Sequence, residues 1–274
     1  MADNGPAQPR PPRRGLGWAA WLSLPFIAFL ALPLLALALR APFDQLWTNL
    51  GKREVIQAMT LSLATSSVAT GLTMVFGTPV AYLLARRPFR LKRLLDTLID
   101  LPTVLPPSVA GVALLVAFGR RGLLGPELDA LGINLPFTQA AVVIAQMFVA
   151  ASLYIKSAAV GFAAVDPELE QAAALDGASP WAAFRFVTVP LTATALLTGA
   201  VLTWARALGE FGATIIFAGN FPGRTQTMPL AIYIGFELDL GVALTLSVIL
   251  LAFSFLILIL IKLLFHPPQA ASPR

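Results

Sequence analysis

The sequence predicts an all-α polytopic membrane protein with six transmembrane helices and both termini in the cytoplasm. Of its 274 residues, 57% are hydrophobic and only 12% are charged, about half the charged share of an ordinary soluble domain. A bilayer core about 30 Å thick needs about 20 apolar residues per helix. Several uncharged runs reach that length, so the chain is expected to cross the membrane repeatedly.

The first expected span, 18–39, follows an N-terminal segment, 1–15, whose Pro and Arg content indicates a disordered cytosolic tail. The span has no convincing small-residue cleavage site, so we expect it to be retained rather than removed as a signal peptide. Further spans are expected at 55–85, 101–118, 137–155, 191–217 and 240–261, giving one transmembrane domain, 16–266, and a C-terminal tail, 267–274.

Three of these spans have features that bear on their shape. The run 55–85 exceeds the bilayer thickness and is expected to tilt or protrude. The run 101–118 is interrupted by prolines near its start, and 191–217 contains two charged residues. Lys262 follows the last span, where its side chain can extend to the interface.

The distribution of basic residues sets the orientation, because loops rich in Lys and Arg resist translocation. With the N-terminus inside, twelve of the nineteen Lys and Arg residues fall on the cytosolic side and six outside, and Arg206 lies within the fifth span. This bias also explains the net charge of +5 without nucleic acid as a partner.

Composition argues against catalysis. The chain has no cysteine and a single histidine, His266, so it offers no thiolate, metal cluster or histidine-based triad, and no catalytic or metal-binding residues are assigned. It also has no Gly-x-x-x-x-Gly-Lys-Ser/Thr segment to hold ATP phosphates. We expect no enzyme activity and no cofactor in this chain.

The loop between the fourth and fifth spans, 166–190, has the pattern of two short helices separated by Gly177. Leu175, Trp181 and Phe184 supply apolar side chains, so the loop suits either docking of another protein or an amphipathic connector on the bilayer. Each helix is expected to start where an N-cap residue precedes a proline: Asp166-Pro167 and Ser179-Pro180.

The spacing within this loop resembles the EAA motif of ABC importer permeases: Glu-Ala-Ala, three residues, Gly, nine residues, then Ile-x-Leu-Pro. Counting from Gly177, the triplet falls on Gln171-Ala172-Ala173 and the end on 187–190. The motif Glu is Gln here, directly after Glu170. The resemblance implies a type I ABC importer permease whose loop docks on a separate ATP-binding subunit. It assigns the coupling contacts to Glu170, Gln171, Ala172, Ala173, Gly177 and Pro190.

Two charges lie four residues apart in the fifth span, Arg206 and Glu210. Ionisable residues inside a membrane are costly unless paired or hydrated, and they mark functional sites by default. They are expected either to form a structural ion pair or to line a gate in the pore.

The segments 101–111, 118–125 and 205–233 resemble the molybdate permease branch, and sulfate and tungstate permeases share much of this pattern. The resemblance implies an inner-membrane pore subunit for molybdate, with sulfate and tungstate as alternatives. It also implies its partners: two ATP-binding cassette subunits that bind ATP and Mg, a second permease copy in a homodimer, and an extracytoplasmic oxyanion-binding protein.

A secondary transporter or channel is the rival class, and a membrane-embedded enzyme is the third. A secondary transporter is expected to carry coupling carboxylates within its spans or paired broken helices in two halves, and Glu210 is the one carboxylate well inside an expected span. For a membrane-embedded enzyme, the sequence lacks a cluster of His, Cys or Asp.

Overall fold

The computed structural model describes residues 17–41 and 43–264, which form helices and no strand. The helix α1, Gly17–Leu39, belongs with the residues up to Ala41 to a first unit. Pro25 and Pro33 lie inside α1 without ending it, and its described side chains are mostly exposed, as suits a helix surrounded by lipid. The tails expected at 1–15 and 267–274, and with them His266, lie outside the described residues.

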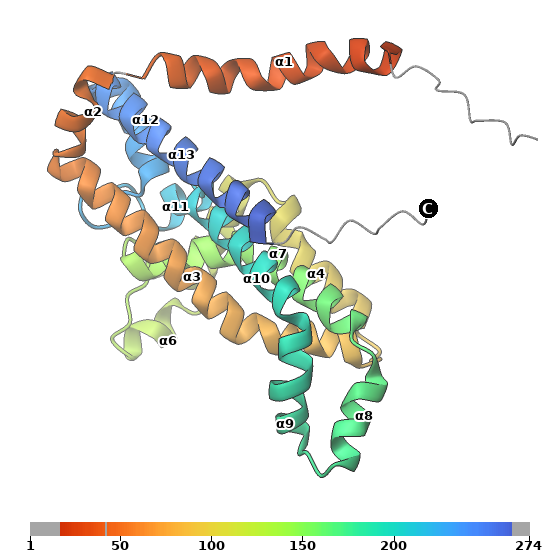
Figure 1. Cartoon of the computed structure of the whole chain (residues 1–274). Helices are drawn as coiled ribbons and strands as arrows, with labels where there is room; N and C mark the ends of the chain where they lie inside the picture. The colour runs from red at the N-terminus through yellow and green to blue at the C-terminus, as the bar shows by residue number, and fades with distance from the viewer. Residues whose placement is uncertain (1–16, 42, 265–274) are drawn as a thin grey trace, which may run out of the picture. The chain divides into compact units, whose positions relative to one another are not determined.

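The second unit holds the remaining helices, which run in several directions (Figure 1). In chain order these are α2 (Phe43–Leu50), α3 (Arg53–Arg86), α4 (Lys92–Val104), α5 (Pro107–Phe118), α6 (Gly125–Ala130), α7 (Gln139–Ala164), α8 (Pro167–Leu175), α9 (Pro180–Ala183), the π-helix η1 (Phe184–Thr188), α10 (Val189–Leu208), α11 (Gly212–Phe217), α12 (Met228–Leu238) and α13 (Leu240–Leu264).

The helices α3, α7 and α10 pack on one another and form the centre of this unit. Small residues let α7 and α10 approach closely, because a Cβ on Gly161 would lie 2.5 Å from the Cβ of Ala195, and one on Gly199 would lie 2.8 Å from that of Ser157. Such contacts replace the hydrophobic driving force that is missing between helices in lipid. The position of α10 is therefore tightly coupled to that of α7.

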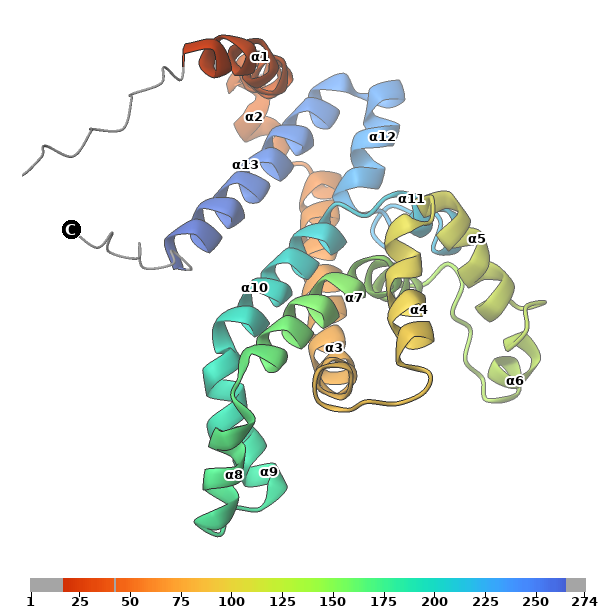
Figure 2. The same cartoon turned by 90° about the vertical axis from the view of Figure 1, so that its right-hand side faces the viewer.

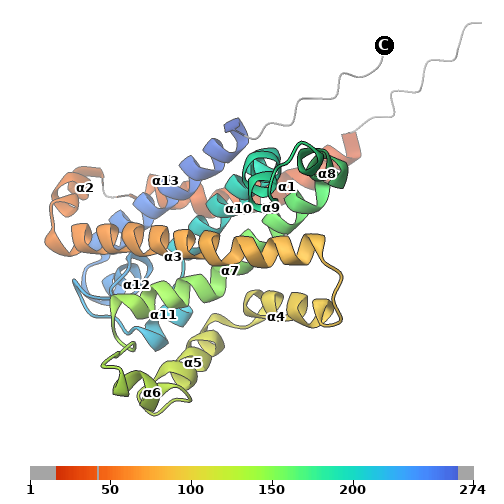
Figure 3. The ribbon, with the colours of Figure 1, turned by 90° about the horizontal axis from the view of Figure 1, so that it is seen from below.

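The expected third span, 101–118, is not one helix. α4 and α5 meet at an angle of 116°, and they lie on the opposite side of α7 from α10 (Figures 2 and 3). The break has a local cause: Leu105 precedes a proline, which pushes it to an extended conformation with ψ of 138°, and Pro107 starts the next helix. The pair is either a broken span or a re-entrant segment.

The expected fifth span, 191–217, is also divided. On its N-terminal side α10 is continuous with η1 and α9, so one helical stretch covers Pro180–Leu208. It ends at Leu208, and α11 begins after a break at residues 209–211. The fourth expected span, 137–155, corresponds to α7, Gln139–Ala164, which extends beyond its C-terminal end.

Ion pairs join elements that are distant in the sequence. Lys52, just before α3, places its Nζ 2.8 Å from Asp239 Oδ2, just before α13, and this hydrogen bond lowers the pKa of Asp239. Lys156 of α7 contacts Asp96 and Asp100 of α4, at 2.5 and 2.9 Å. The second set ties the bent pair to the central helices.

Five helices within the described ranges are long and apolar enough to cross a membrane, and the bent pair raises the number to six if it counts as one span. The protein is therefore a multi-pass membrane protein, and the all-α class predicted from composition is confirmed.

The chain contains no native cysteine, so its topology can be mapped directly with single cysteines and a membrane-impermeant maleimide. We expect cysteines at Asp129 and Pro222 to react in spheroplasts, because both positions are expected outside. Those at Arg90 and Asp176 should react only after permeabilisation, because most Lys and Arg residues are expected on the cytosolic side, where these two positions lie. All four positions are exposed, and Pro222 avoids the positive φ of its neighbour Gly223.

The comparison of Arg90 with Asp129 is decisive for the bent pair, since one precedes α4 and the other follows α5. Labelling on the same side would make the pair re-entrant and the count of six spans wrong. Labelling of Pro222 only after permeabilisation would overturn the orientation.

Candidate functional site

The loop 166–190, called the coupling loop below, folds as the helix caps predict. Asp166 accepts a hydrogen bond from the backbone N–H of Glu168 at 2.9 Å, and α8 starts at the proline between them. Ser179 likewise accepts from the N–H of Ala182 at 3.2 Å and starts α9. The two predicted helix starts are confirmed, and local side-chain chemistry is sufficient to explain them.

Gly177 makes the turn between α8 and α9 with a φ of +90°, in the left-handed region that side chains with a Cβ rarely adopt. Beyond its two neighbours, no described residue lies within 4 Å of the Cβ position, so the requirement for glycine comes from the backbone and not from crowding. The predicted break at this residue is confirmed.

The hairpin of α8 and α9 projects from one end of the second unit (Figures 1 and 2). It carries large apolar side chains to solvent: Leu175 is 90% exposed and Trp181 is 67% exposed. Phe184 differs from the expectation, because it turns inward against the rings of Tyr82 and Phe162. The projecting apolar surface is therefore made by two of the three expected side chains.

Glu170 also faces inward, and its carboxylate joins three elements. Its Oε1 accepts from Arg86 Nη2, at the end of α3, at 3.2 Å, and from Thr188 Oγ1, at the start of α10, at 2.6 Å. A charge-assisted hydrogen bond of this kind holds its partners more strongly than a neutral one. Glu170 thus ties α8 to the end of α3 and to the last residue of η1, directly before α10, a role that the sequence did not reveal.

The other coupling-loop residues identified from the sequence lie on its surface. Ala173 is half-buried, and the exposed ones are Gln171, Ala172, Gly177 and Pro190. Among the residues that the structure describes, no group of three or more His, Asp or Glu side chains forms a metal site.

Arg206 and Glu210 meet at the other end of the helix that starts at Pro180. Arg206 Nη1 lies 2.8 Å from Glu210 Oε2, and Glu210 Oε1 accepts from the N–H of Ala213 in the first turn of α11 at 2.9 Å. The Glu210 side chain is 2% exposed and that of Arg206 is 38% exposed. The carboxylate therefore has the geometry of a satisfied buried group that joins α10 to α11, and the guanidinium stays partly open.

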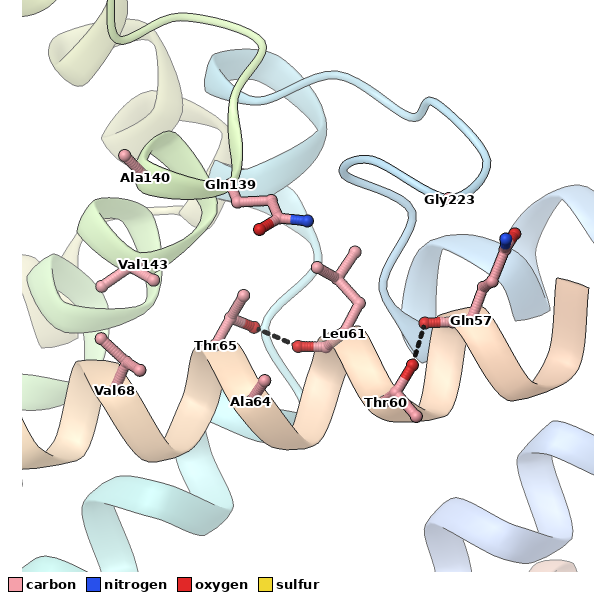
Figure 4. Close-up of a pocket in the computed structure, with 10 residues that line it drawn as sticks. All are labelled: Gln57, Thr60, Leu61, Ala64, Thr65, Val68, Gln139, Ala140, Val143 and Gly223. Atoms are coloured by element: carbon pink, nitrogen blue, oxygen red, sulfur yellow. Dashed lines mark hydrogen bonds between the residues drawn. The ribbon is translucent and has the colours of Figure 1, made fainter.

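A groove of about 390 Å³ follows α3 and the N-terminal turn of α7, and is called the α3 groove below (Figure 4). Gln57, Thr60 and Thr65 of α3 and Gln139 of α7 give it polar groups. The two threonine hydroxyls donate to carbonyls of their own helix. The side chains of Gln57 and Gln139 are therefore the main polar groups of the groove that are available to a ligand. The sequence indicates 55–85 only as an uncharged span and does not predict this groove.

Residues 77–266 match the family described as binding-protein-dependent transport system inner membrane component. The molybdenum transport system permease protein ModB of Mycobacterium tuberculosis (strain ATCC 25618 / H37Rv) is 44% identical over 217 residues, or 78% of this chain and 82% of that protein. ModB of Escherichia coli (strain K12) is 45% identical over 178 residues, or 65% of this chain and 78% of that protein.

A solved chain of a bacterial ABC transporter involved in the import of the acidic polysaccharide alginate has a TM-score of 0.71 at 15% identity, covering 91% of this chain and 95% of that one. The fold is that of the type I ABC importer permeases. Since the family match covers more than half of the sequence, this chain belongs to the binding-protein-dependent transport system inner membrane components.

Proposed function

We propose that this chain forms half of the membrane pore of an ATP-driven importer, with molybdate as its substrate. The observation that carries the proposal is the projecting hairpin of the coupling loop in a chain of this family. Leu175 and Trp181 are exposed there, at the end of the second unit. Burial of each such side chain against a partner contributes about 1.5–3 kcal/mol, which favours a docked protein.

The docked protein is an ATP-binding subunit that binds ATP and Mg, so hydrolysis takes place outside this chain. Ala172 and Gly177 are exposed small residues that allow close approach, and Gln171 is exposed beside them. A second permease copy related by a two-fold axis would present the same surface to a second ATPase. An extracytoplasmic binding protein delivers the anion on the opposite side.

Two contacts support transmission of movement from this surface into the membrane. Glu170 accepts hydrogen bonds from Arg86 and Thr188, so α8 is held to the end of α3 and to the end of η1, where α10 begins. The helical stretch Pro180–Leu208, about 44 Å long at 1.5 Å per residue, ends next to Glu210. We assign Arg206 and Glu210 to the gate on this basis, and the α3 groove to the wall of the pathway.

Molybdate is favoured because both relatives described above are named as molybdenum transport permeases. Tungstate and sulfate are tetrahedral dianions of the same charge and remain the alternatives. We expect the binding protein to make the finer selection.

The test is uptake into proteoliposomes that contain the permease and its cognate ATPase, with the binding protein added outside and ATP inside. We expect accumulation of molybdate that depends on ATP and on the binding protein, with tungstate competing strongly and sulfate weakly. Uptake without the ATPase, driven by an ion gradient, would establish a secondary transporter instead. Preferred accumulation of sulfate would replace the substrate and leave the class intact.

A further inference from the structure

A second pocket, of about 550 Å³, gathers two arginines that are far apart in the sequence, Arg120 and Arg224, and is called the arginine pocket below. Thr138, which caps the N-terminus of α7, also lines it. The coupling loop follows the opposite end of α7, about 39 Å away for a helix of 26 residues. The pocket therefore lies at the end of the second unit that is remote from the ATPase docking surface.

The pocket is strongly positive. No carboxylate lines it, and neither arginine forms an ion pair with any residue in the part of the chain that the structure describes. With the Asn134 amide assigned to satisfy both of its polar atoms, its oxygen accepts from Nε and Nη2 of Arg120 at 3.1 and 2.6 Å. A neutral amide orients this guanidinium without cancelling its charge, and further N–H donors remain for an anion.

Backbone geometry holds the two sides of the pocket together. Phe137 has a φ of +62°, a left-handed conformation that costs a bulky residue about 1–2 kcal/mol. Its N–H donates to the carbonyl of Phe217 at 3.3 Å, and its ring packs edge-on against Phe221, three residues before Arg224. Strain of this kind persists where surrounding contacts enforce it, typically at ligand sites.

One further feature favours an anion in the pocket, and another gives the pocket an outlet. The N-terminus of the long helix α7 adds the partial positive charge of its dipole beside Thr138. The α3 groove is adjacent, because Gln139 and Gly223 line the groove while Thr138 and Arg224, their neighbours in the chain, line the pocket.

We propose that the arginine pocket binds a small divalent oxyanion and releases it into the α3 groove. The inference deepens the proposed function by giving the permease its own substrate site, separate from that of the binding protein, and the choice of molybdate as probe rests on that function. Planar guanidinium groups match the oxygen pairs of a tetrahedral oxyanion, which favours this ligand over a univalent ion such as chloride.

The test is equilibrium binding of radiolabelled molybdate to the permease–ATPase complex in nanodiscs, without the binding protein. We expect saturable binding that sulfate displaces and chloride does not. Arg120→Gln and Arg224→Gln should each weaken it about tenfold, since each removes charge-assisted hydrogen bonds. Arg121→Gln is the matched control: Arg121 is exposed and adjacent but does not line the pocket, so binding should be unchanged.

Equal binding by wild type and by the double variant Arg120→Gln/Arg224→Gln would overturn the proposal. So would the absence of binding in a complex that still performs uptake. A double variant that binds the anion normally but whose ATPase no longer responds to the binding protein would show that the arginines hold a carboxylate of that protein. A complex without oxyanion uptake but with arginine-dependent binding would refute the proposed function and leave the site standing.

Discussion

Gly177→Leu is expected to reduce the recovery of the ATPase with the purified permease about tenfold, while the permease still inserts into the membrane. A side chain at φ of +90° costs about 1–2 kcal/mol. The turn would relieve this strain by changing shape and so move α8 relative to α9. A loss of about 1.4 kcal/mol in docking corresponds to a tenfold weaker complex. Co-purification from detergent extracts, quantified against the permease band, measures the effect.

Gly132→Leu provides the matched control. Gly132 also has a positive φ, of +71°, and apart from its neighbours no residue in the described ranges lies within 4 Å of its Cβ position, so the strain and the open space are alike. It follows α6, in the loop expected on the opposite side of the membrane. This variant should retain the ATPase. An equal loss in both variants would mean that the backbone strain acts on the fold as a whole, and full recovery with Gly177→Leu would remove the docking surface from this turn.

Arg206→Ala should lower the thermal midpoint of the purified permease more than Glu210→Gln does. Removal of Arg206 leaves a carboxylate whose side chain is 2% exposed and which, among the described residues, keeps Ala213 N–H as its hydrogen-bond partner, at a cost of about 3–5 kcal/mol. Glu210→Gln keeps an acceptor for that N–H and leaves a guanidinium that water can reach, at a cost of about 1 kcal/mol. Intrinsic tryptophan fluorescence on heating measures both.

The double variant Arg206→Ala/Glu210→Gln should recover much of the stability lost in Arg206→Ala, because no buried charge is then left unpaired. Uptake tests the gate separately: loss of uptake in stable Glu210→Gln, or ATP-independent leakage of molybdate in Arg206→Ala, is expected. A variant in which Arg206 and Glu210 are exchanged would not distinguish a structural ion pair from a gate. An arginine at position 210 cannot accept the hydrogen bond from Ala213 N–H, so the exchange would disturb the structure in either case. Equal midpoints for both single variants would contradict the pairing, and wild-type transport in both would withdraw the gate assignment.

The parts of the fold that sequence reasoning found are those with local causes. The start of α8 depends on Asp166 and its proline, and the turn at Gly177 depends on one backbone conformation, so neighbouring residues were sufficient. The bend between α4 and α5 was only partly visible. Its prolines are plain in the sequence, but an angle of 116° is set by what the helices pack against.

Site features built from distant residues were not predictable from one sequence. Glu170 looked like a contact for the partner, yet Arg86 and Thr188 hold it inside the chain. Arg120 and Arg224 were visible as basic loop residues, but only the fold places them in one pocket. The sequence pattern showed which side chains can carry function and left open the direction in which they point.

The π-helix η1 sets the rotational phase between the coupling loop and the transmembrane helix. A π turn closes its hydrogen bonds over one residue more than an α turn, and each helical residue rotates the chain by about 100°. If the five residues Phe184–Thr188 formed α turns instead, each residue would turn the chain further, and α9 would be rotated by about a quarter of a turn relative to α10. Trp181 would then face a different direction, and Phe184 would leave its aromatic partners. The π conformation of η1 therefore sets the direction in which α9 leaves α10.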